Sequence, residues 1–404
     1  MDRIFKEVRR VEGKQKKVAL VSCYFQPNYG SMLQALATQE ILDIMNVPNE
    51  TICIDGLKKE IHDAKMRYFK SRMFSGDVIR DKLGYLKLAA AQKVNKKLGK
   101  QIAQRKKCFE EYSRRKFHVS RLYVSKAELS RYAEDYAAFL VGSDQLWLPS
   151  NIAADYYTLS FVPDKVRKIA YATSFGVSAL PKKQAESAKQ FIPRIDYLSV
   201  REQSGQKLIK ELIGIDAKLV CDPTMLLTKE QWGKLVEDKR IIKEKYIFCY
   251  FLGDNQFSRR CANFLRKKTG YKIVALQNLD MYIRSDAAFA DEAPYQIDPE
   301  GFVNLIRHAE FVCTDSFHGT VFSLIHHKNF FTFRRFWRAS TMSTNSRIDS
   351  LLNVLGCEYR LIESTADFKD ALRTKLDADG VEARLNDFRK DSLAFLEGSL
   401  QGLV

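Results

Sequence analysis

Short apolar runs alternate along the chain with longer stretches of helical periodicity. In the first half, the runs are rich in β-forming residues and too short for helices, so each is predicted to be a buried strand. They cover residues 17–24, 51–54, 138–141, 167–171, 197–200 and 218–221. Polar turns and helix-like segments separate them; residues 32–45, for example, place Leu33, Leu36 and Ile41 on one face. This alternation is typical of parallel βαβ units.

A second series of the same kind follows residues 226–245, which are charged and contain no strand pattern. Its predicted strands cover residues 246–252, 272–276, 311–314 and 329–333. A chain of 404 residues also exceeds the roughly 250–300 at which single cores stop growing. We therefore predict an α/β protein with two Rossmann-like domains facing a cleft. The predicted units are residues 1–228, residues 229–380 and a C-terminal amphipathic helix over 381–404.

Several predicted strands end in turns that carry polar residues or glycine. These turns lie at residues 28–30, 142–144, 174–176, 201–202, 222 and 315–319. In a doubly wound sheet the carboxyl ends of the strands share one edge, where ligands bind. A single turn of this kind is usually only a tight connection. Together they predict one cleft lined with hydroxyls, carboxylates, an arginine and a histidine.

The segment FVCTDSFHG, residues 311–319, carries the most specific chemistry. It is predicted to be a strand (311–314), a turn and the start of a helix over 319–326. Free backbone N–H groups and the positive end of a helix dipole suit a phosphate, and His318 adds a side chain that titrates near neutral pH. The turn alone leaves a second interpretation open, in which it is only a helix N-cap with a packed histidine.

Composition places the chain among soluble globular proteins. Its hydrophobic content is 46% and its charged content 28%, and no run approaches the ~18 apolar residues of a membrane helix. The charged N-terminus lacks a signal-peptide pattern, so we expect a cytoplasmic protein. The eight cysteines are scattered without a CxxC pair, which indicates buried hydrophobic residues and neither disulfides nor zinc ligands. We expect no metal site and no cofactor; His326 and His327 are helix neighbours that point apart.

The positive charge is concentrated in one segment. Residues 65–121 hold 18 lysines and arginines against four acidic residues, which is +14 of the total charge of +17. Apolar residues interleave with the lysines at near-helical spacing, at Leu83, Leu86, Leu88, Ala90 and Val94. The pattern predicts a basic helical insertion over about 60–125, consisting of one or two amphipathic helices.

Three uses of this insertion stay open from the sequence. The first alternative is a solvated flank of the fold. The second is a surface that binds an anionic membrane or a lipid-linked substrate, and the third is a surface that binds nucleic acid. No nucleic-acid motif and no interleaved aromatic platform accompany the charge, so we expect no nucleic-acid partner. Membrane contact through residues 65–121 would make the protein peripheral at the inner face of the membrane.

Six ordered sequence blocks resemble one family. They are NYGSMLQALATQ, VGSDQLWLP, YATSFG, SVREQSGQ, VCDPTMLL, and CTDSFHGTVFSLIHHKNFFTF followed by NSRIDSLLNVLG. Between about residues 18 and 356 the chain resembles the polysaccharide pyruvyl transferase family. The resemblance implies a two-domain GT-B-like fold, with the acceptor on the first domain and the donor on the second. It also implies a transferase that moves pyruvate from phosphoenolpyruvate onto two sugar hydroxyls of a cell-surface glycan or its lipid-linked precursor, forming a ketal.

The resemblance assigns roles to individual residues. His318 is the expected general acid, and Arg201 matches an arginine that grips the donor carboxylate. Asp144 is expected to act as base towards a sugar hydroxyl or to bind it, with a helix N-cap as the alternative. The remaining expected donor-binding residues are Ser316, Phe317, Gly319, Arg334 and Arg335. The expected acceptor-binding residues are Asn28, Gly30, Ser143, Gln145 and Ser174.

The chain departs from the family pattern at Ser316, where some members carry an arginine that binds the donor. The missing charge is expected from arginines nearby in sequence, namely Arg334, Arg335, Arg338 or Arg347. Two rival classes remain. A GT-B glycosyltransferase would use a nucleotide sugar, but no ribose-binding glutamate with base-stacking residues is identified in the second domain. A non-enzymatic surface-binding protein would explain the basic segment and leave the cleft residues without a purpose.

Overall fold

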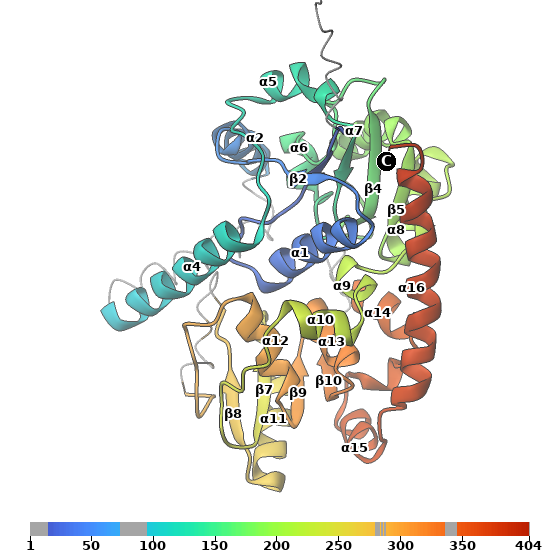
Figure 1. Ribbon diagram of the computed structural model, residues 1–404. Helices are drawn as coiled ribbons and strands as arrows, with labels where there is room; N and C mark the ends of the chain where they lie inside the picture. Colours follow the sequence, from blue (N-terminus) through green and yellow to red (C-terminus); the bar gives the residue numbers. More distant parts are fainter. Residues whose placement is uncertain are drawn as a thin grey trace, which may run out of the picture.

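Two parallel sheets, each flanked by helices, form the two halves of the molecule (Figure 1). The computed structural model describes residues 15–72, 95–278, 283, 286, 288–335 and 346–403. The first sheet has six strands in the order β2-β1-β3-β4-β5-β6, and the second has five in the order β11-β10-β9-β7-β8. All the pairings between neighbouring strands are parallel. The predicted fold class, two Rossmann-like α/β domains, is confirmed.

The first half contains the elements that precede the linker between the sheets. Its strands are β1 (Val18–Val21), β2 (Asn49–Thr51), β3 (Ala138–Val141), β4 (Arg167–Thr173), β5 (Tyr197–Val200) and β6 (Lys218–Leu219). Its helices are α1 (Tyr29–Ile44), α2 (Lys58–Ser71), α4 (Lys96–Lys116), α5 (Lys126–Arg131), α6 (Pro149–Ala154), α7 (Lys182–Phe191) and α8 (Gln203–Ile213). Short 3-10 helices lie at Ala133–Asp135 and Ile192–Arg194.

The second half begins after two linking helices, α9 (Pro223–Leu226) and α10 (Lys229–Leu235). Its strands are β7 (Tyr246–Tyr250), β8 (Lys272–Ala275), β9 (Phe311–Thr314), β10 (Asn329–Phe333) and β11 (Leu361–Ile362). Its helices are α11 (Gln256–Thr269), α12 (Pro299–Arg307), α13 (Phe317–Ile325), α14 (Ser346–Val354), α15 (Thr365–Arg373) and α16 (Ala378–Leu400), with a 3-10 helix at Glu358–Arg360. The predicted boundary at residue 228 falls between the two sheets.

Some predicted element bounds are corrected by the structure. Strand β2 covers Asn49–Thr51 and not residues 51–54, because the N–H of Cys53 donates to Ser120 Oγ and that of Ile54 to the Tyr24 hydroxyl. Helix α13 begins at Phe317, two residues before the predicted start, because the Ser316 side chain caps it. Strand β11 was not predicted; it has only two residues and gives no periodicity to detect.

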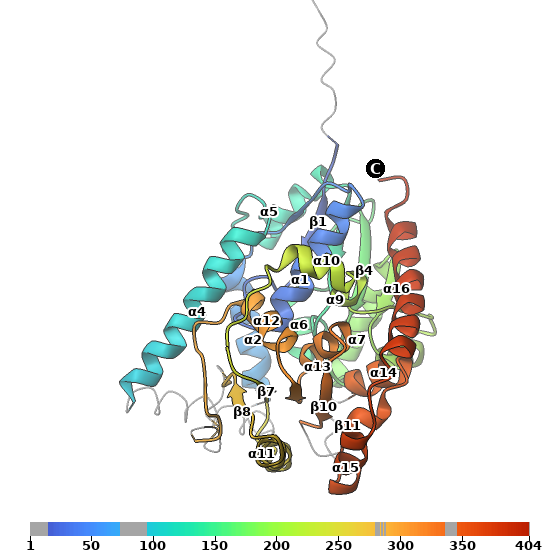
Figure 2. The same ribbon diagram turned by 60° about the horizontal axis from the view of Figure 1, so that its bottom comes forward.

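The two halves share one apolar core across their contact. Tyr29, in the first turn of α1, stacks on Phe302 of α12 with ring centroids 4.8 Å apart and planes at 9°. Its hydroxyl donates to the Ile297 carbonyl at 3.0 Å. Figure 2 shows α1, α12 and α13 together at the centre of the molecule, between the sheets. The last helix, α16, then runs back along both halves (Figure 1), and its Ser392 Oγ accepts the N–H of Cys221.

Helix α4 of the basic insertion is an inter-domain contact. Arg105 is buried, with 1% of its surface exposed, and donates to the backbone carbonyls of Gln277, Pro294 and Tyr295 in the second half. Lys116 pairs with Glu300 at 2.9 Å. The buried apolar residues of α4 are Ile102, Phe109 and Tyr112, which pack into the shared core. Some basic residues and the apolar face of α4 therefore make contacts within the protein and are not free to bind a partner.

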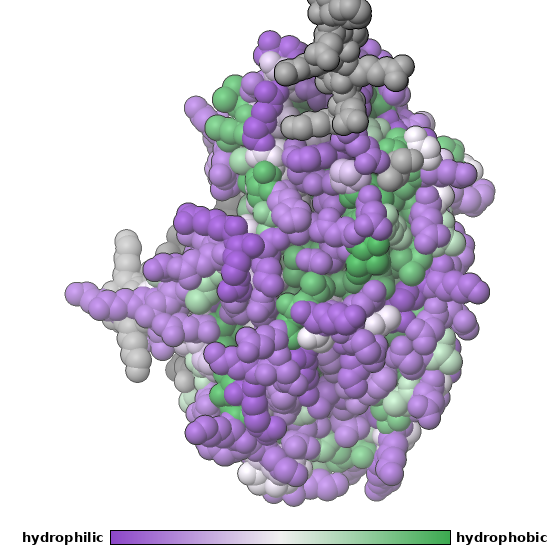
Figure 3. All heavy atoms as spheres, in the orientation of Figure 1, coloured by the Kyte–Doolittle hydropathy of each residue, from purple (hydrophilic) through white to green (hydrophobic). Residues whose placement is uncertain are grey.

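The outward face of α4 is mostly hydrophilic (Figure 3). The predicted apolar stripe at Leu83, Leu86, Leu88, Ala90 and Val94 lies outside the described residues, so membrane contact stays a prediction. Within the described ranges, no helix is both long and apolar enough to span a bilayer. All eight cysteines are free thiols, and six of them are buried, as the sequence predicts.

Candidate active site

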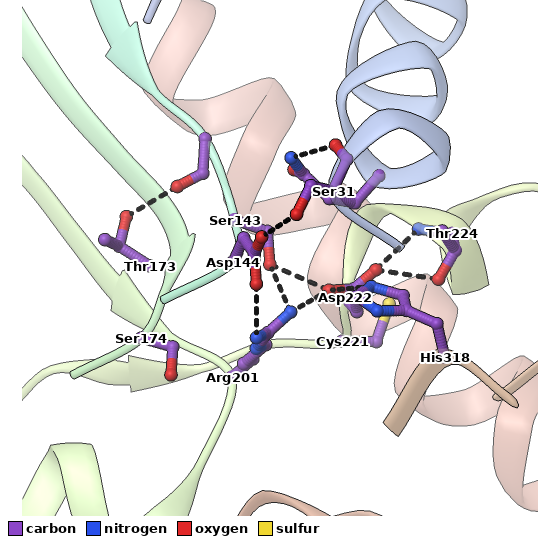
Figure 4. A network of polar contacts seen from close by, with 12 residues as sticks. Ser31, Ser143, Asp144, Thr173, Ser174, Arg201, Cys221, Asp222, Thr224 and His318 are labelled. Atoms are coloured by element: carbon purple, nitrogen blue, oxygen red, sulfur yellow. Dashed lines mark hydrogen bonds and ion pairs between the residues drawn. The ribbon is translucent and has the colours of Figure 1, made fainter. Parts of the chain in front are cut away.

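The order of the first sheet defines a crevice between β1 and β3. Strand β2 lies on one side of β1 and β3 on the other, and ligands of doubly wound folds bind where the order reverses. The start of α1 and the turn after β3 lie against each other at this point. The Ser31 hydroxyl in α1 donates to Asp144 Oδ2 at 2.5 Å across it (Figure 4). Asn28 caps α1 by accepting the Ser31 N–H at 3.1 Å, so this residue shapes the wall.

Asp144 is held at the crevice by an unusual backbone conformation. Its φ is +79°, a region that residues other than glycine seldom adopt and that is typical of constrained functional sites. Its carbonyl accepts the N–H groups of Leu146 and Ser174, which fixes the turn to the end of β4. The N-cap alternative for Asp144 is wrong, since the next helix, α6, is preceded by Leu148 at its N-cap.

A buried ion-pair network organises this edge of the sheet. The Arg201 side chain, which has no exposed surface, donates through Nη1 to Asp222 Oδ2 at 2.6 Å and through Nη2 to Asp144 Oδ1 at 3.3 Å. Ser143 donates to Asp222 at 2.8 Å and accepts from Arg201 at 3.1 Å. The other oxygen of Asp222 accepts the N–H and the hydroxyl of Thr224. Both terminal nitrogens of Arg201 are therefore engaged by carboxylates of the protein.

Both carboxylates of this network are ionised at neutral pH. Burial alone would raise the pKa of Asp222, but the charges of His318 and Arg201 outweigh burial and lower it. Burial opposes ionisation of Asp144 as well, and Arg201, His318 and the Ser31 hydrogen bond together hold its pKa below the ordinary value. Asp144, with 17% of its side chain exposed, is therefore a fixed negative charge that faces the crevice.

His318 reaches this network from the second domain. Its Nε2 lies 3.6 Å from Asp222 Oδ2, and the ring packs edge-on against Phe317. The imidazole lies directly against α1, because a Cβ added to Gly30 would be 2.0 Å from His318 Nδ1. Glycine at position 30 therefore makes room for the histidine. The two halves meet at this contact.

The start of α13 uses two of the predicted donor-binding residues for its own structure. Ser316 caps the helix by accepting the Gly319 N–H at 3.3 Å. Gly319 packs on Thr314, whose Oγ1 would be 2.5 Å from an added Cβ. The interpretation of this turn as an N-cap with a packed histidine is thus partly correct. The turn also lies next to two arginines. The centre of the Phe317 ring is 4.6 Å from the guanidinium carbon of Arg201 and 5.8 Å from that of Arg347.

The arginines near β10 are placed differently from one another. Arg334 binds Glu363 and Asp349, and so has two carboxylate partners of its own. The Nε of Arg335 lies 4.0 Å from Asp315. Arg347 is buried in the first turn of α14, with 6% of its surface exposed. Arg338 lies outside the described residues.

Several buried polar atoms around the crevice lack a hydrogen-bond partner within the part of the chain that the structure describes. Those without a hydrogen bond are Gln145 Nε2, Arg201 Nε, Glu202 Oε2, His318 Nε2 and Arg347 Nε. Longer ion-pair contacts remain for some of them, since Arg201 Nε lies 3.9 Å from Glu202 Oε2 and His318 Nε2 lies 3.6 Å from Asp222 Oδ2. Burial raises the pKa of Glu202, against the charges of Arg201 and Arg347. Ser174 Oγ accepts the Gly176 N–H at 3.1 Å in the same region. Because buried polar groups are normally hydrogen-bonded, this concentration indicates a site completed by a ligand.

The network contains residues to which the sequence assigned no role. Asp222 was recognised only as a turn residue, although it binds Arg201 and faces His318. Ser31, which directly follows the turn predicted at residues 28–30, donates a hydrogen bond to Asp144. The Asp-Pro-Thr sequence does predict an N-cap at Asp222. No local signal could show that its second oxygen meets an arginine and a histidine from distant segments.

Two parallel-sheet α/β domains that meet at a polar, buried contact define a GT-B-like fold. A Listeria monocytogenes protein assigned as a UDP-N-acetylglucosamine 2-epimerase shares this fold, with a TM-score of 0.51, 11% identity, and coverage of 96% of this chain and 97% of that one. A Methanocaldococcus jannaschii UDP-GlcNAc 2-epimerase, solved with UDP-GlcNAc and UDP, has a TM-score of 0.46, 12% identity and coverage of 92% and 93%. No curated protein matches the chain.

The family described as polysaccharide pyruvyl transferase matches residues 28–335. This stretch begins at the cap of α1 and includes Asp144, Arg201, Asp222 and His318. The chain belongs to the polysaccharide pyruvyl transferase family and is a transferase. Among the described residues, no group of three or more histidine, cysteine or acidic side chains is placed to hold a metal ion.

Proposed function

We propose that this enzyme transfers pyruvate from phosphoenolpyruvate to two hydroxyls of one sugar, forming a ketal and releasing phosphate. The single observation that carries the proposal is the meeting of His318 from the second domain with the Asp144–Arg201–Asp222 network of the first. This arrangement brings a proton carrier, a fixed carboxylate and guanidinium groups to one inter-domain crevice. Its unpartnered polar atoms fit a small, highly charged donor.

The proposed reaction starts with proton transfer from His318 to the methylene carbon of phosphoenolpyruvate. The adjacent carbon becomes electron-poor, and one sugar hydroxyl attacks it and gives its proton to the now neutral His318, which restores the histidine. The bond to the phosphate oxygen then breaks, and the second hydroxyl attacks the same carbon. The phosphate leaves with the proton of that second hydroxyl, so one diol and one phosphoenolpyruvate give one ketal and one phosphate.

Asp144 is proposed to hold the acceptor rather than to remove its proton completely. Its lowered pKa, set against burial by Arg201 and His318, makes it a weak proton acceptor but a permanent hydrogen-bond acceptor. A sugar hydroxyl bound to Asp144 is aligned for attack, and the carboxylate stabilises positive charge that develops next to it. Asp222, unlike Asp144, has no exposed surface, and it instead keeps Arg201 and His318 in position.

One feature of the second sheet disfavours a nucleotide-sugar donor. The order of this sheet reverses between β7 and β9, where a nucleotide phosphate binds in many doubly wound folds. There the Asp315 carboxylate accepts the N–H groups of Leu252 and Gly253 at 2.7 and 2.9 Å. These two backbone N–H groups are therefore already bonded to a protein carboxylate and are not available to a nucleotide phosphate.

The acceptor is proposed to be a sugar of a cell-surface glycan or of its lipid-linked oligosaccharide precursor. The exposed lysines and arginines of the basic insertion would hold the enzyme at the anionic inner face of a membrane, where such precursors are assembled.

The test is to incubate the purified enzyme with phosphoenolpyruvate and a panel of glycan acceptors. Phosphate release should depend on the acceptor, whose mass should increase by one pyruvate less one water. A parallel reaction with UDP-sugars should leave the acceptors unchanged. Transfer of a sugar from a nucleotide, with no use of phosphoenolpyruvate, would reject the proposal.

A further inference from the structure

Arg347 is a buried cation that lacks a bonded anion. Only 6% of its surface is exposed, and its Nε is buried without a hydrogen-bond partner. No hydrogen bond or ion pair to its guanidinium exists among the residues that the structure describes. Isolated buried charges are strongly unfavourable unless they are paired, so a side chain in this state indicates a missing partner.

Other buried arginines of this protein have their partners. Arg360, with 1% of its surface exposed, donates to the carbonyls of Ala371 and Thr374 at 3.2 and 2.9 Å. Arg105 binds three carbonyls, and Arg201 binds Asp222 and Asp144. The unpartnered state of Arg347 is therefore specific to its position and not a general property of buried arginines here.

The surroundings of Arg347 place it in the active-site crevice. Its guanidinium carbon lies 5.8 Å from the centre of the Phe317 ring, the same ring that Arg201 approaches to 4.6 Å. Burial, followed by repulsion from Arg201, lowers the pKa of Arg347 to about 9, while Asp144 and Glu202 oppose this shift. Since arginine keeps its proton in proteins, the lowered pKa reflects the cost of holding this charge without an anion.

We propose that Arg347, with Arg201 beside the Phe317 ring, forms the site for an anionic group of the ligand, and that Arg347 makes the direct contact. The sequence led us to expect Arg201 in that role, but both its terminal nitrogens are committed to protein carboxylates. The Arg347 guanidinium is free to bind a carboxylate or phosphate with two parallel hydrogen bonds. Position 347 lies beyond the matched family stretch, which ends at residue 335.

This inference accounts for the serine at position 316. In the fold, Ser316 caps α13 and contributes no charge. A guanidinium from the first turn of α14 would supply the missing positive charge from a different element. The chemical class of ligand, a small carboxylate or phosphate, follows from the structure alone. Its identity as phosphoenolpyruvate rests on the proposed function.

Thermal unfolding of the full-length protein tests the proposal without catalysis. Inorganic phosphate and phosphoenolpyruvate, titrated separately, should each raise the Tm of the wild type, because a ligand that binds only the folded state stabilises it. Arg347→Met should bind either anion about 10- to 100-fold more weakly. Without anion, Arg347→Met should unfold at the same or a higher temperature, because an unpaired buried charge has been removed.

Arg360→Met is the matched control. It removes an equally buried arginine of the same domain whose partners are protein carbonyls. It should lower the Tm without anion, yet leave the anion affinity unchanged. Arg347→Lys provides a second variant that keeps the charge but loses the two-pronged geometry, and its anion affinity should fall between those of wild type and Arg347→Met.

Wild-type anion affinity in both Arg347 variants would overturn the inference, as would a wild type whose Tm responds to neither anion. An anion response that Arg347→Met abolishes, in an enzyme that transfers no pyruvate to any acceptor, would support the anion site and reject the proposed function. The two proposals can therefore fail separately.

Discussion

The Nε2 of His318 lies 3.6 Å from Oδ2 of Asp222, and the two residues come from different halves of the molecule. Asp222 also binds Arg201 and Ser143, so the position of the histidine depends on a network built entirely in the first domain. A histidine of one domain thus lies against a fixed carboxylate of the other. The proposed catalytic arrangement exists only when the two domains are in contact.

His318→Gln tests proton donation. Glutamine retains hydrogen-bonding groups but cannot supply a proton to carbon, so we expect kcat to fall by about 10²- to 10⁴-fold. A Tm measured in parallel checks that the variant is folded at the assay temperature, and a modest decrease is expected because His318 helps to hold the pKa of Asp222 low. Wild-type turnover in this variant would show that His318 only binds substrate.

Asp222→Asn should make the enzyme much less stable and should flatten its response to acid. The substitution leaves the buried Arg201 without its closest carboxylate, which costs about 3–5 kcal/mol of unfolding free energy. The pKa of Asp222 is lowered in the folded state, since His318 and Arg201 outweigh burial. Its contribution to stability is therefore complete above the unfolded-state pKa of about 3.9 and is lost as the pH falls below that value.

Urea unfolding between pH 7 and pH 3 measures this effect. The free energy of unfolding of the wild type should fall steeply at the acid end, whereas that of Asp222→Asn should start lower and change less. Parallel curves for the two proteins would mean that Asp222 does not carry the acid sensitivity.

Gly30→Ala should displace His318, the proposed general acid. The new Cβ would be 2.0 Å from His318 Nδ1, so the imidazole or the second domain must move. A shift of about 1 Å in a reacting group can cost about 100-fold in rate, which is the loss in kcat that we expect. Gly233→Ala is the control, because nothing lies within 4 Å of a Cβ at that position of α10. Equal activity of the two variants would contradict the close packing of Gly30 on His318.

The sequence predicted much of the architecture, because for most elements the hydrophobic periodicity and the turn residues at the ends indicate the same helix or strand. Strand β5 occurs at the predicted residues, and strand β9 leads into α13 as expected. Strand β2 was displaced because the amides of Cys53 and Ile54 bond to distant side chains, which a local pattern cannot show. The same limitation explains why the sequence could not distinguish among four arginines near β10 as the source of the positive charge that binds the substrate. Among those that the structure describes, Arg347 is the most buried, and its guanidinium has no hydrogen bond to the described residues.

The basic insertion gives a separate prediction about membrane contact. Four basic residues of α4 are exposed, and the described residues show no ion pair or hydrogen bond from them to the second domain: Lys100, Lys106, Lys107 and Arg114. Replacing these four by glutamine should reduce flotation with anionic liposomes and leave activity on a soluble acceptor intact. Flotation of the wild type should weaken with salt, as the Debye length falls from ~10 Å at 0.1 M to ~3 Å at 1 M.

Arg105→Gln is the contrasting variant in the same helix. Arg105 is buried against carbonyls of Gln277, Pro294 and Tyr295, so its loss should lower stability and leave liposome binding unchanged. A wild-type protein that ignores anionic liposomes at low salt would restrict the insertion to its inter-domain role.

The most direct test of the account is mass spectrometry of the acceptor after reaction with phosphoenolpyruvate in D2O. Protonation of the methylene carbon from the exchangeable proton of His318 should place one deuterium in the methyl group of a pyruvate ketal. The label should persist after the product is returned to H2O, because hydrogens bonded to carbon do not exchange, and His318→Gln should give almost no labelled product. An acceptor left unmodified, or a ketal without deuterium, would contradict the account.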